Sequence, residues 1–258
     1  MKLATWNVNS LNVRLPHVLE WLEHNPVDAL CLQELKQTDD KFPVDAFAQI
    51  GYHACWAGQK TYNGVAIVSR EPGSDVQRNI PDFDDPQQRI IATTLPGPGG
   101  ECRVISAYCP NGQAVGSDKY AYKLAWFAAL RTWLETELVR YPNLVILGDY
   151  NVAPDDRDVH DPQAWEGQIL VSESERAAFQ ALLDLGLVDT FRMFDQAPQS
   201  FTWWDYRRFG FRRNAGMRID HALASPALAS ICIATEIDKV PRGWDKPSDH
   251  TPVIAHFG

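Results

Sequence analysis

The stretch Val145-Ile-Leu-Gly-Asp-Tyr-Asn-Val152 constrains the fold more strongly than any other part of the sequence. Its apolar beginning favours a buried strand, and a carboxylate and an amide follow it two residues apart. The stretch Leu3-Ala-Thr-Trp-Asn-Val-Asn9 has the same form and ends in two amides, also two residues apart. Two α/β halves that meet at their strand ends would bring these polar groups together. We therefore expect two similar halves with one polar site between them.

Short runs of β-type residues alternate with amphipathic helical patterns along the whole sequence. The runs that favour strands are Lys2–Trp6, Ala29–Leu32, Gly64–Ser69, Arg89–Leu95, Arg103–Cys109, Leu144–Leu147, Asp220–Ala224 and Pro252–Phe257. One helix is expected to start near Pro16, and a second to span Asp118–Tyr141. A third opens with the capping box Ser172-x-x-Glu175 and is expected to stop at Gly186. Strands and helices mixed in this way indicate an α/β fold with helices on the sheet faces.

Composition places the chain among globular proteins. It has 258 residues, with 24 Lys and Arg against 33 Asp and Glu, which gives a formal net charge of −9. Hydrophobic residues make up 45% and charged residues 22%, and these fractions exclude a disordered or fibrous chain. No linker rich in Pro, Gly or Ser divides the sequence, so we expect a single domain over residues 1–258. The acidic balance disfavours non-specific nucleic-acid binding, because phosphate contacts normally come with an excess of Lys and Arg.

Membrane and redox patterns indicate the cellular compartment. No apolar run is long enough to span a bilayer, and no apolar segment at the N-terminus marks the chain for secretion. The five cysteines are odd in number and show no C-x-x-C spacing. We expect them to be reduced core residues of a cytoplasmic protein that does not bind membranes.

Further polar groups stand at the ends of the expected strands, where loops present side chains to ligands. They are Gln33-Glu34, Asp149 with Asn151, Asp249-His250 and, at a strand start, Asp220-His221. Taken singly, each is typical of a turn residue, a helix cap or a local hydrogen-bonded pair. Together, carboxylates and amides without a Cys or His cluster favour a hard cation such as Mg²⁺. With one histidine, such a set suits phosphodiester hydrolysis, because the metal neutralises phosphate charge while a carboxylate deprotonates water.

Five short motifs follow one another along the chain. They are Trp6-Asn-Val-Asn-Ser, Leu32-Gln-Glu, Gly148-Asp-Tyr-Asn, Arg218-Ile-Asp and Ser248-Asp-His. In this order they closely resemble the exonuclease III family of DNA-repair nucleases, within the endonuclease/exonuclease/phosphatase superfamily. Each motif is weak alone, whereas the ordered set is specific and covers essentially the whole chain. The resemblance implies a four-layer α/β sandwich of two packed mixed β-sheets flanked by helices.

The resemblance also implies a metal site. Glu34 is expected to be the principal metal ligand, with Asn9 and Asp249 close by, binding directly or through water. The expected cation is Mg²⁺, with Mn²⁺ as a substitute. Whether one or two metals act is left open by the sequence.

The remaining catalytic roles follow from the same resemblance. Asp149 is expected to orient and deprotonate the attacking water, while Asn151 and Asn7 help to position water and phosphate. His250 is expected to donate to the scissile phosphate, and Asp220 to orient the imidazole ring and fix its tautomer.

The segment 201–218 favours DNA over the inositol phosphates and sphingomyelin that other members of the superfamily hydrolyse. It interleaves five arginines with aromatic rings, although an exposed loop pinned by its rings would also have this pattern. The residues expected to contact phosphate or DNA are Tyr108, Asn111, Trp203, Arg207, Arg208, Met217 and Arg218, with further backbone contacts from Arg14, Lys36, Lys60 and Lys119. By resemblance, Trp203, Met217 and Ile219 line a pocket for a flipped-out abasic sugar or a terminal nucleotide.

One departure from the family pattern lies near this expected pocket. Where the family commonly has a small residue and then an aromatic one, this chain has Leu170-Val171 ahead of Ser172. The bulkier Leu170 is expected to hinder an extrahelical abasic site while leaving terminal phosphodiesters accessible. We therefore expect 3′-end processing to be retained and abasic-site incision to be weakened.

These observations together predict a Mg²⁺-dependent DNA-repair phosphodiesterase. Its expected activities are 3′-5′ exodeoxyribonuclease on duplex DNA, 3′-phosphatase or 3′-end cleaning, and weakened abasic-site endonuclease. The expected partner is duplex DNA with 3′ ends, nicks or abasic sites, bound by a monomer. One alternative is a small-molecule or lipid phosphoesterase of the same superfamily. Another is a catalytically dead nucleic-acid-binding homologue, which would lack metal and base positions that are all present here.

Overall fold

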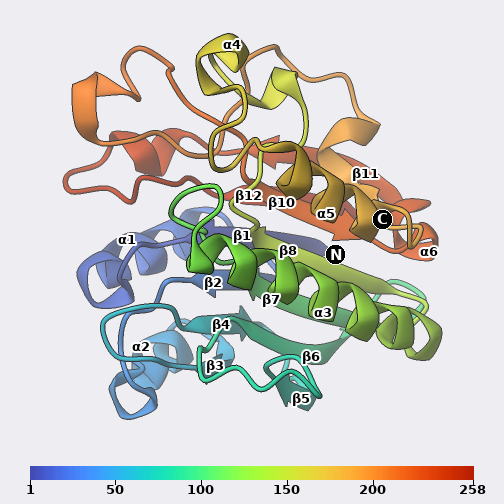
Figure 1. The fold of residues 1–258 in the computed structure, drawn as a ribbon. Coiled ribbons are helices and arrows are strands. Elements are labelled where there is room, and N and C mark those ends of the chain that lie inside the picture. The colour runs from blue at the N-terminus through green and yellow to red at the C-terminus, as the bar shows by residue number, and fades with distance from the viewer.

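The computed structural model describes residues 1–258 and contains two mixed six-stranded sheets (Figure 1). Sheet A has the strand order β11-β12-β1-β2-β4-β3, and sheet B has the order β5-β6-β7-β8-β10-β9. The strands are β1 (Lys2–Asn7), β2 (Ala29–Gln33), β3 (His53–Ala57), β4 (Val65–Ser69), β5 (Ser74–Arg78), β6 (Ile90–Gly97), β7 (Gly100–Tyr108), β8 (Leu144–Asp149), β9 (Val188–Asp189), β10 (Asp220–Ala224), β11 (Cys232–Ile237) and β12 (Val253–Phe257). The α-helices are α1 (Leu11–His24), α2 (Val44–Gln49), α3 (Asp118–Arg140), α4 (Pro162–Trp165), α5 (Glu173–Leu183) and α6 (Pro226–Ala229).

The two sheets pack face to face, and helices cover both outer faces (Figure 1). A cluster of buried apolar side chains from both sheets, including Leu3, Ile67 and Val104, fills the space between them. Helices α1 and α2 bury Trp21 and Phe47 against sheet A. Helices α3 and α5 cover sheet B with a cluster of their own. The prediction of a four-layer α/β sandwich of two mixed sheets is therefore confirmed.

Strand direction brings the polar strand ends to one edge. Strands β1 and β2 are parallel neighbours in sheet A, as are β7 and β8 in sheet B, so each pair ends at the same side. Asn7 ends β1 and Asp149 ends β8. The Asn7 side-chain amide donates a hydrogen bond across the two sheets to the Asp149 carboxylate at 2.9 Å. The two polar strand ends that the sequence predicted to meet therefore do so.

Four strands were not predicted from the sequence, namely β3, β5, β9 and β11. These four are the edge strands of the two sheets. An edge strand is half solvated, so it carries mixed residues such as Ser74-Asp-Val-Gln-Arg78 and lacks the apolar run of a central strand. Strand β11 also contains a bulge between Cys232 and Ala234, which breaks the two-residue alternation.

The helix boundaries agree with the predictions except at α1. This helix begins at Leu11, and Pro16, the expected start, lies inside it. The early start is fixed by tertiary contacts, because Leu11 is buried and its backbone N–H donates to the Leu35 carbonyl. The capping box of α5 forms as predicted, with the Ser172 side chain and the Glu175 side chain each accepting from the other's backbone.

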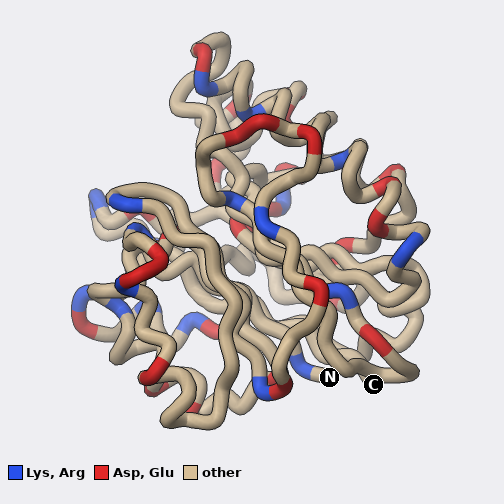
Figure 2. Tube along the Cα trace, turned by 90° about the horizontal axis from the view of Figure 1, so that it is seen from below, with Lys and Arg blue, Asp and Glu red and all other residues tan.

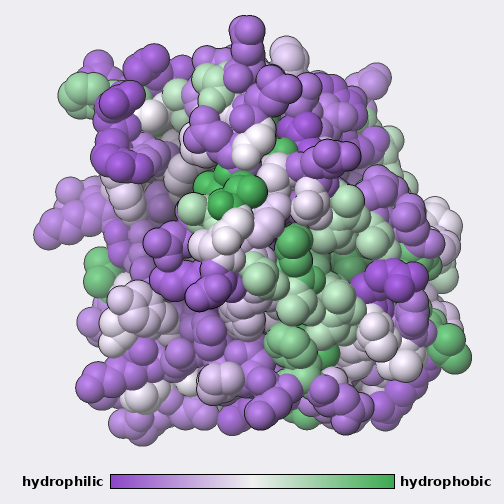
Figure 3. Space-filling model, in the orientation of Figure 1, coloured by the Kyte–Doolittle hydropathy of each residue, from purple (hydrophilic) through white to green (hydrophobic).

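Charged residues of both signs are spread along the chain (Figure 2). Figure 2 shows positive and negative residues interspersed along the trace, so the net charge of −9 is not gathered in one segment. Figure 3 shows hydrophilic residues over most of one face, with the apolar ones gathered over α3. No helix is both long enough and apolar enough to cross a bilayer.

Beneath the polar edge of the sheets lies a buried network of charges centred on Arg218. This side chain is 2% exposed, and its guanidinium binds Asp158 at 2.7 Å and Asp189 at 2.8 Å. It also donates to Nδ1 of His221, whose Nε2 donates to the Val152 carbonyl. The expectation that Arg218 contacts DNA therefore needs correction, because every face of this buried guanidinium is occupied inside the fold. Its role is to hold the start of β10 against neighbouring loops.

The network keeps His221 neutral. Burial and the adjacent Arg218 guanidinium lower the pKa of His221 to about 4. A histidine with a lowered pKa binds a proton in the unfolded chain near pH 6.5 but resists protonation in the fold. The folded state therefore loses stability as the pH falls from about 6.5 toward 4.

We predict that His221→Gln removes part of this acid sensitivity. Glutamine supplies one donor and one acceptor but does not titrate, so the loss of unfolding free energy between pH 6.5 and 4 should shrink by up to about 3 kcal/mol. Urea unfolding at several pH values measures this difference. The exposed His53 provides the control, because His53→Gln should leave the pH dependence unchanged. An unchanged slope in His221→Gln would contradict the assignment.

Candidate active site

Strand ends and neighbouring loops of both sheets supply the candidate site. Glu34 directly follows β2, and Asp149 is the last residue of β8. Asp220 begins β10 and lies opposite Asp149 in the antiparallel register. His250 lies in the loop before β12. Asp149 and Asp220 are thus fixed by strand geometry, which holds functional groups more precisely than a mobile loop would, while Glu34 and His250 lie next to strands.

Glycine at position 148 allows the strands to approach closely just before Asp149. A Cβ atom at Gly148 would lie 1.8 Å from the Ala107 carbonyl oxygen, a distance that no side chain tolerates. The parallel pairing of β7 and β8 at this point therefore requires glycine. This close pairing sets Asp149 beside Tyr108, its register partner at the end of β7.

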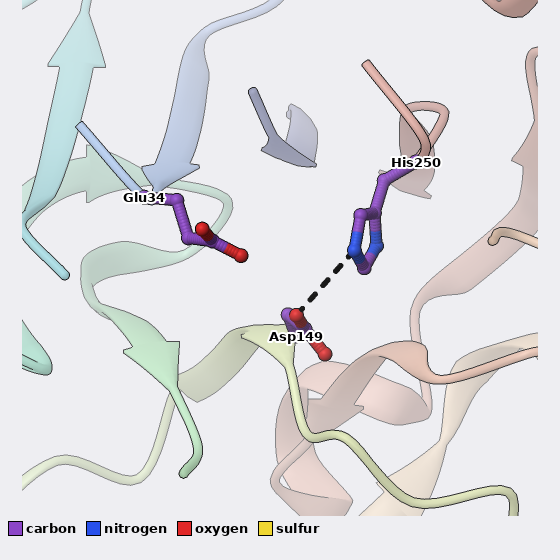
Figure 4. Close-up of side chains that lie close together, drawn as sticks. All are labelled: Glu34, Asp149 and His250. Atoms are coloured by element: carbon purple, nitrogen blue, oxygen red, sulfur yellow. Dashed lines mark ion pairs between the residues drawn. The ribbon is translucent and has the colours of Figure 1, made fainter. Parts of the chain in front are cut away.

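Glu34, Asp149 and His250 form the centre of the site. One ligand atom from each lies within 4.8 Å of the others, and Figure 4 shows the three side chains pointing toward one another. The His250 Nε2 atom is 3.7 Å from an Asp149 carboxylate oxygen, the pair joined by the dashed line in Figure 4. Asn7 bridges the two acids, because its amide nitrogen donates to Glu34 and to Asp149, each at 2.9 Å.

The site is electrostatically strained by its own carboxylates. Burial raises the pKa of the Asp149 carboxyl, and the Asp220 carboxylate adds to this effect, whereas His250 opposes it. A divalent cation beside Glu34 and Asp149 would offset the repulsion between their carboxylates and favour the ionised form of Asp149. The donors present are carboxylate and amide oxygens, the ligands that Mg²⁺ prefers. The residues therefore fit a magnesium site.

His250 is held in one orientation by Asp220. The imidazole Nδ1 donates to the Asp220 carboxylate at 2.9 Å, which leaves Nε2 directed at Asp149. Burial lowers the pKa of His250, but the Asp220 and Asp149 carboxylates outweigh it, so the net effect is a raised pKa. The two carboxylates therefore favour the protonated ring, in which Nε2 can donate a hydrogen bond.

Asn9 and Asp249, the other expected metal ligands, lie beside the cluster of Glu34, Asp149 and His250. Asn9 donates from its side chain to Asp249 at 2.9 Å, and the Trp203 indole donates to the other Asp249 oxygen at 3.0 Å. The Lys36 ammonium contacts both Asn9 and Glu34, the latter at 2.8 Å. The ligand cluster thus joins Glu34 to Asp149 and His250, while Asn9 and Asp249 lie one contact further out. Lys36, expected to meet the DNA backbone, instead pairs with the site itself.

Asn151, Asn111 and Tyr108 line the opposite side of Asp149. The Asn151 backbone N–H donates to the Asp149 carboxylate at 2.8 Å, which fixes that side chain. Asn111 donates from its side chain to the Asn151 side-chain oxygen at 3.1 Å. Burial raises the pKa of Tyr108, and the neighbouring acids Glu34 and Asp149 raise it further, so its hydroxyl stays protonated. The side-chain amides of Asn111 and Asn151 thus form a hydrogen-bonded chain that ends at Asp149.

The segment expected to bind DNA divides into exposed and buried parts. Arg207 and Arg208 are exposed, and Arg207 pairs with Asp205 at 2.5 Å. Trp203 is partly buried and Met217 fully buried. The two arginines therefore lie at the surface, whereas Met217 lies in a buried apolar cluster against which Trp203 packs.

Leu170 occupies the region of the expected nucleotide pocket. It is 4% exposed and belongs to the same buried cluster as Met217 and Ile219, against which Trp203 packs. Its backbone φ of +74° is unusual for a leucine, because left-handed conformations crowd a Cβ atom. The sequence argument for Leu170 rested on its size alone, and no pattern indicated its backbone conformation.

Two buried charges beside the site were missed from the sequence. Lys123 of α3 pairs with Glu175 of α5 at 2.5 Å, with both side chains inaccessible to solvent. The capping box drew attention to Glu175 as a helix start, but nothing in the sequence indicates its partner across two helices. Charged residues on amphipathic helices usually face solvent, so the pattern favoured exposure.

Comparison with known proteins gives consistent similarities. The model of the Endonuclease/Exonuclease/phosphatase family matches residues 4–250, a range that includes Asn7 and His250. Exodeoxyribonuclease III of Haemophilus influenzae is 37% identical over 267 residues, covering 100% of both chains. A 3′ phosphatase from Neisseria, solved with a product DNA hairpin, is 50% identical with a TM-score of 0.97, covering 100% of this chain and 99% of that one. An AP endonuclease from Archaeoglobus fulgidus is 39% identical with a TM-score of 0.94 and the same coverage.

We predict that Asp220→Asn lowers the pH at which His250 loses its proton. Removing this carboxylate takes away the strongest attraction on the protonated ring, and the pKa should fall by more than about 1 pH unit. Imidazole NMR titration of the metal-free protein measures the change. The variant Glu236→Gln, which removes an acid paired with the distant His256, should leave the His250 titration unchanged. Equal titration of His250 in Asp220→Asn and the parent chain would contradict the prediction.

Proposed function

The chain belongs to the exonuclease III and abasic-site endonuclease family of the endonuclease/exonuclease/phosphatase superfamily, and from this premise we propose a Mg²⁺-dependent DNA-repair phosphodiesterase that acts mainly on 3′ ends of duplex DNA. The observation that carries the proposal is the convergence of Glu34, Asp149 and His250 at one edge of the paired sheets. The proposed enzyme is a single domain of residues 1–258 that works as a monomer. The core shared between the two sheets supports the single domain.

Glu34 would hold the cation, with Asn9 and Asp249 completing its surroundings directly or through water. Bound Mg²⁺ neutralises charge that develops on the phosphate during hydrolysis, and Mn²⁺ prefers the same oxygen ligands. The fit of this set is supported by the carboxylates of Glu34 and Asp149, whose oxygen atoms lie close enough together to bind one cation. Lys36 contacts Glu34 from the outer side and would remain as a second positive charge.

The chain's own residues supply the proton transfers. Asp149 accepts a proton from the attacking water, whose oxygen adds to phosphorus as the bond to the leaving oxygen breaks. Asn7 and Asn151 hold Asp149 by hydrogen bonds and so fix the direction of its free lone pairs. His250, oriented by Asp220, donates from Nε2 to a phosphate oxygen. Tyr108 and Asn111 add donors on the far side of the phosphate.

DNA is the substrate that the surrounding loops support best. Arg207 and Arg208 are exposed beside Trp203, whose indole reaches Asp249 in the site. Arginine contacts phosphates, and an aromatic ring beside the site can stack on a base. The Neisseria relative solved with a DNA hairpin supports the same class of partner. A lipid or small-molecule phosphoester would not need such a basic and aromatic rim, and a dead homologue would not retain the complete set of acids.

The balance between substrates is proposed to depend on Leu170. Its side chain fills the cluster with Met217 and Ile219, where a flipped-out abasic sugar would have to enter. A terminal nucleotide can fray from the duplex and needs less room for its sugar inside the protein. We therefore assign 3′-5′ exonuclease and 3′-phosphatase activity as the main functions, with weak abasic-site incision.

We predict that Asp149→Asn and Glu34→Ala fail in different ways. Asp149→Asn removes the proton acceptor, so turnover on a 3′-recessed duplex should fall on the order of 10²–10⁴-fold while DNA binding persists. Glu34→Ala should lower turnover and raise the Mg²⁺ concentration needed for half-maximal activity. Exonuclease rates over a Mg²⁺ series and DNA binding by fluorescence anisotropy separate the two effects. Full activity in either variant, or in EDTA, would reject the mechanism.

We also predict that Leu170→Gly increases abasic-site incision relative to exonuclease activity. Glycine opens the cluster and accepts the left-handed backbone without strain. Incision of an abasic duplex and digestion of a 3′-recessed duplex are measured with one preparation. A parent chain that already cuts abasic DNA efficiently, with no increase in Leu170→Gly, would remove Leu170 from the proposal.

A further inference from the structure

Lys123 is a fully buried ammonium outside the cluster of Glu34, Asp149 and His250. Its Nζ donates to the carbonyl oxygens of Asn151 at 2.6 Å and Asn111 at 3.2 Å, and to the Glu175 carboxylate at 2.5 Å. An ammonium has three donors, and all three are used. Lys123 therefore ties the loop after β8 and the loop after β7 to the start of α5.

Glu175 uses its remaining lone pairs on the segment that ends in α5. One carboxylate oxygen accepts the backbone N–H of Leu170 at 3.1 Å. The other accepts the backbone N–H of Ser172 at 3.2 Å and its hydroxyl at 2.6 Å. Both carboxylate oxygens of Glu175 thus accept hydrogen bonds, and the oxygen that binds Leu170 also pairs with the buried Lys123 ammonium.

These contacts hold Leu170 in its unusual conformation. The backbone φ of +74° disfavours leucine, and such residues persist only where neighbouring groups fix the backbone. Leu170 is fixed on both sides, because its N–H donates to Glu175 and its carbonyl accepts from Ala153 at 2.8 Å. The side chain is thereby directed into the cluster with Met217 and Ile219.

We propose that Lys123 and Glu175 are positioning residues that set substrate selectivity by holding Leu170 in the nucleotide pocket. Neither touches the substrate. The pair acts through the Leu170 backbone, and it couples the occupied pocket to the Asn151 and Asn111 loops beside the scissile phosphate. The inference rests on the proposed role of Leu170 as the residue that hinders abasic DNA.

Glu175→Gln tests the inference with little change in size. A glutamine amide carries donors at one end, and that end must face either the Leu170 N–H and Lys123 or the two Ser172 donors. Facing Leu170, the amide nitrogen opposes the Leu170 N–H and the Lys123 ammonium directly. Facing Ser172, it opposes the Ser172 backbone N–H and loosens the segment that follows Leu170. The ratio of abasic incision to 3′ exonuclease activity should rise roughly tenfold, as expected for one lost hydrogen bond to a charged group. Loss of folded protein cancels in this ratio, because one preparation supplies both rates.

Glu137→Gln is the matched control. Glu137 lies on α3, as Lys123 does, and forms a buried ion pair with Arg103 at 2.8 Å. This pair has no contact with Leu170. The ratio should stay at the parent value. Glu175→Asp is the second variant, since it keeps a negative charge opposite Lys123 but shortens the reach to Leu170, and it should raise the ratio in the same direction if Glu175→Gln does not fold.

Combining Glu175→Gln with Leu170→Gly separates this inference from the proposed function. If the pair acts by holding Leu170, Glu175→Gln raises the ratio in the parent chain and leaves it unchanged in the Leu170→Gly background. A rise in Leu170→Gly with none in either Glu175 variant overturns the inference and leaves the role of Leu170 intact. An equal rise in both backgrounds also overturns it, because Glu175 would then act independently. No rise in Leu170→Gly overturns both.

Discussion

The two hydrogen bonds that the Asn7 side-chain amide donates to Glu34 and Asp149 are the interactions on which the site depends. The two acids belong to different sheets, and the buried Asn7 amide joins them with contacts of 2.9 Å each. Two carboxylates this close repel each other in a low-dielectric setting. The amide dipole offsets part of the repulsion, and a divalent cation would offset the rest. The Asn7 contacts that join the two sheets therefore also hold two carboxylates close together, where a divalent cation could bind between them.

The buried charges around the site each have a partner of opposite charge. Arg218 with its two aspartates, and Lys123 with Glu175, are each compensated by opposite charge within the protein. Breaking such a pair leaves an uncompensated buried charge, which typically costs about 3–5 kcal/mol. These pairs therefore act as fixed supports. Asp149, in contrast, has a carboxyl pKa that burial raises, and the Asp220 carboxylate adds to this effect, which suits the proton-acceptor role proposed for it.

The central strands and the polar residues at their ends could be predicted from the sequence. Asn7, Glu34 and Asp149 were found because each follows a buried apolar run, and strand direction then brings them together. Edge strands such as β5 were missed because solvent removes the need for an apolar run there. Arg218 was assigned to DNA and proved to be buried, since residue type does not distinguish a surface arginine from one paired inside the fold. Lys123 and its contacts arise only from packing between helices distant in sequence.

Placement of charge, more than its sum, decides how an acidic chain can bind an acidic polymer. Glu34, Asp149 and Asp249 place negative charge where a cation would bind. The exposed Arg207 forms an ion pair with Asp205, which offsets its positive charge in the protein without DNA. In the proposed function the cation therefore adds positive charge at the site, where the acids would otherwise repel the phosphate, and supplements the exposed arginines around it. Binding of metal and binding of DNA are then linked, and each must raise the affinity for the other by the same factor. A net charge of −9 is therefore compatible with the proposed DNA enzyme, because a cation bound in the site would raise the affinity for DNA.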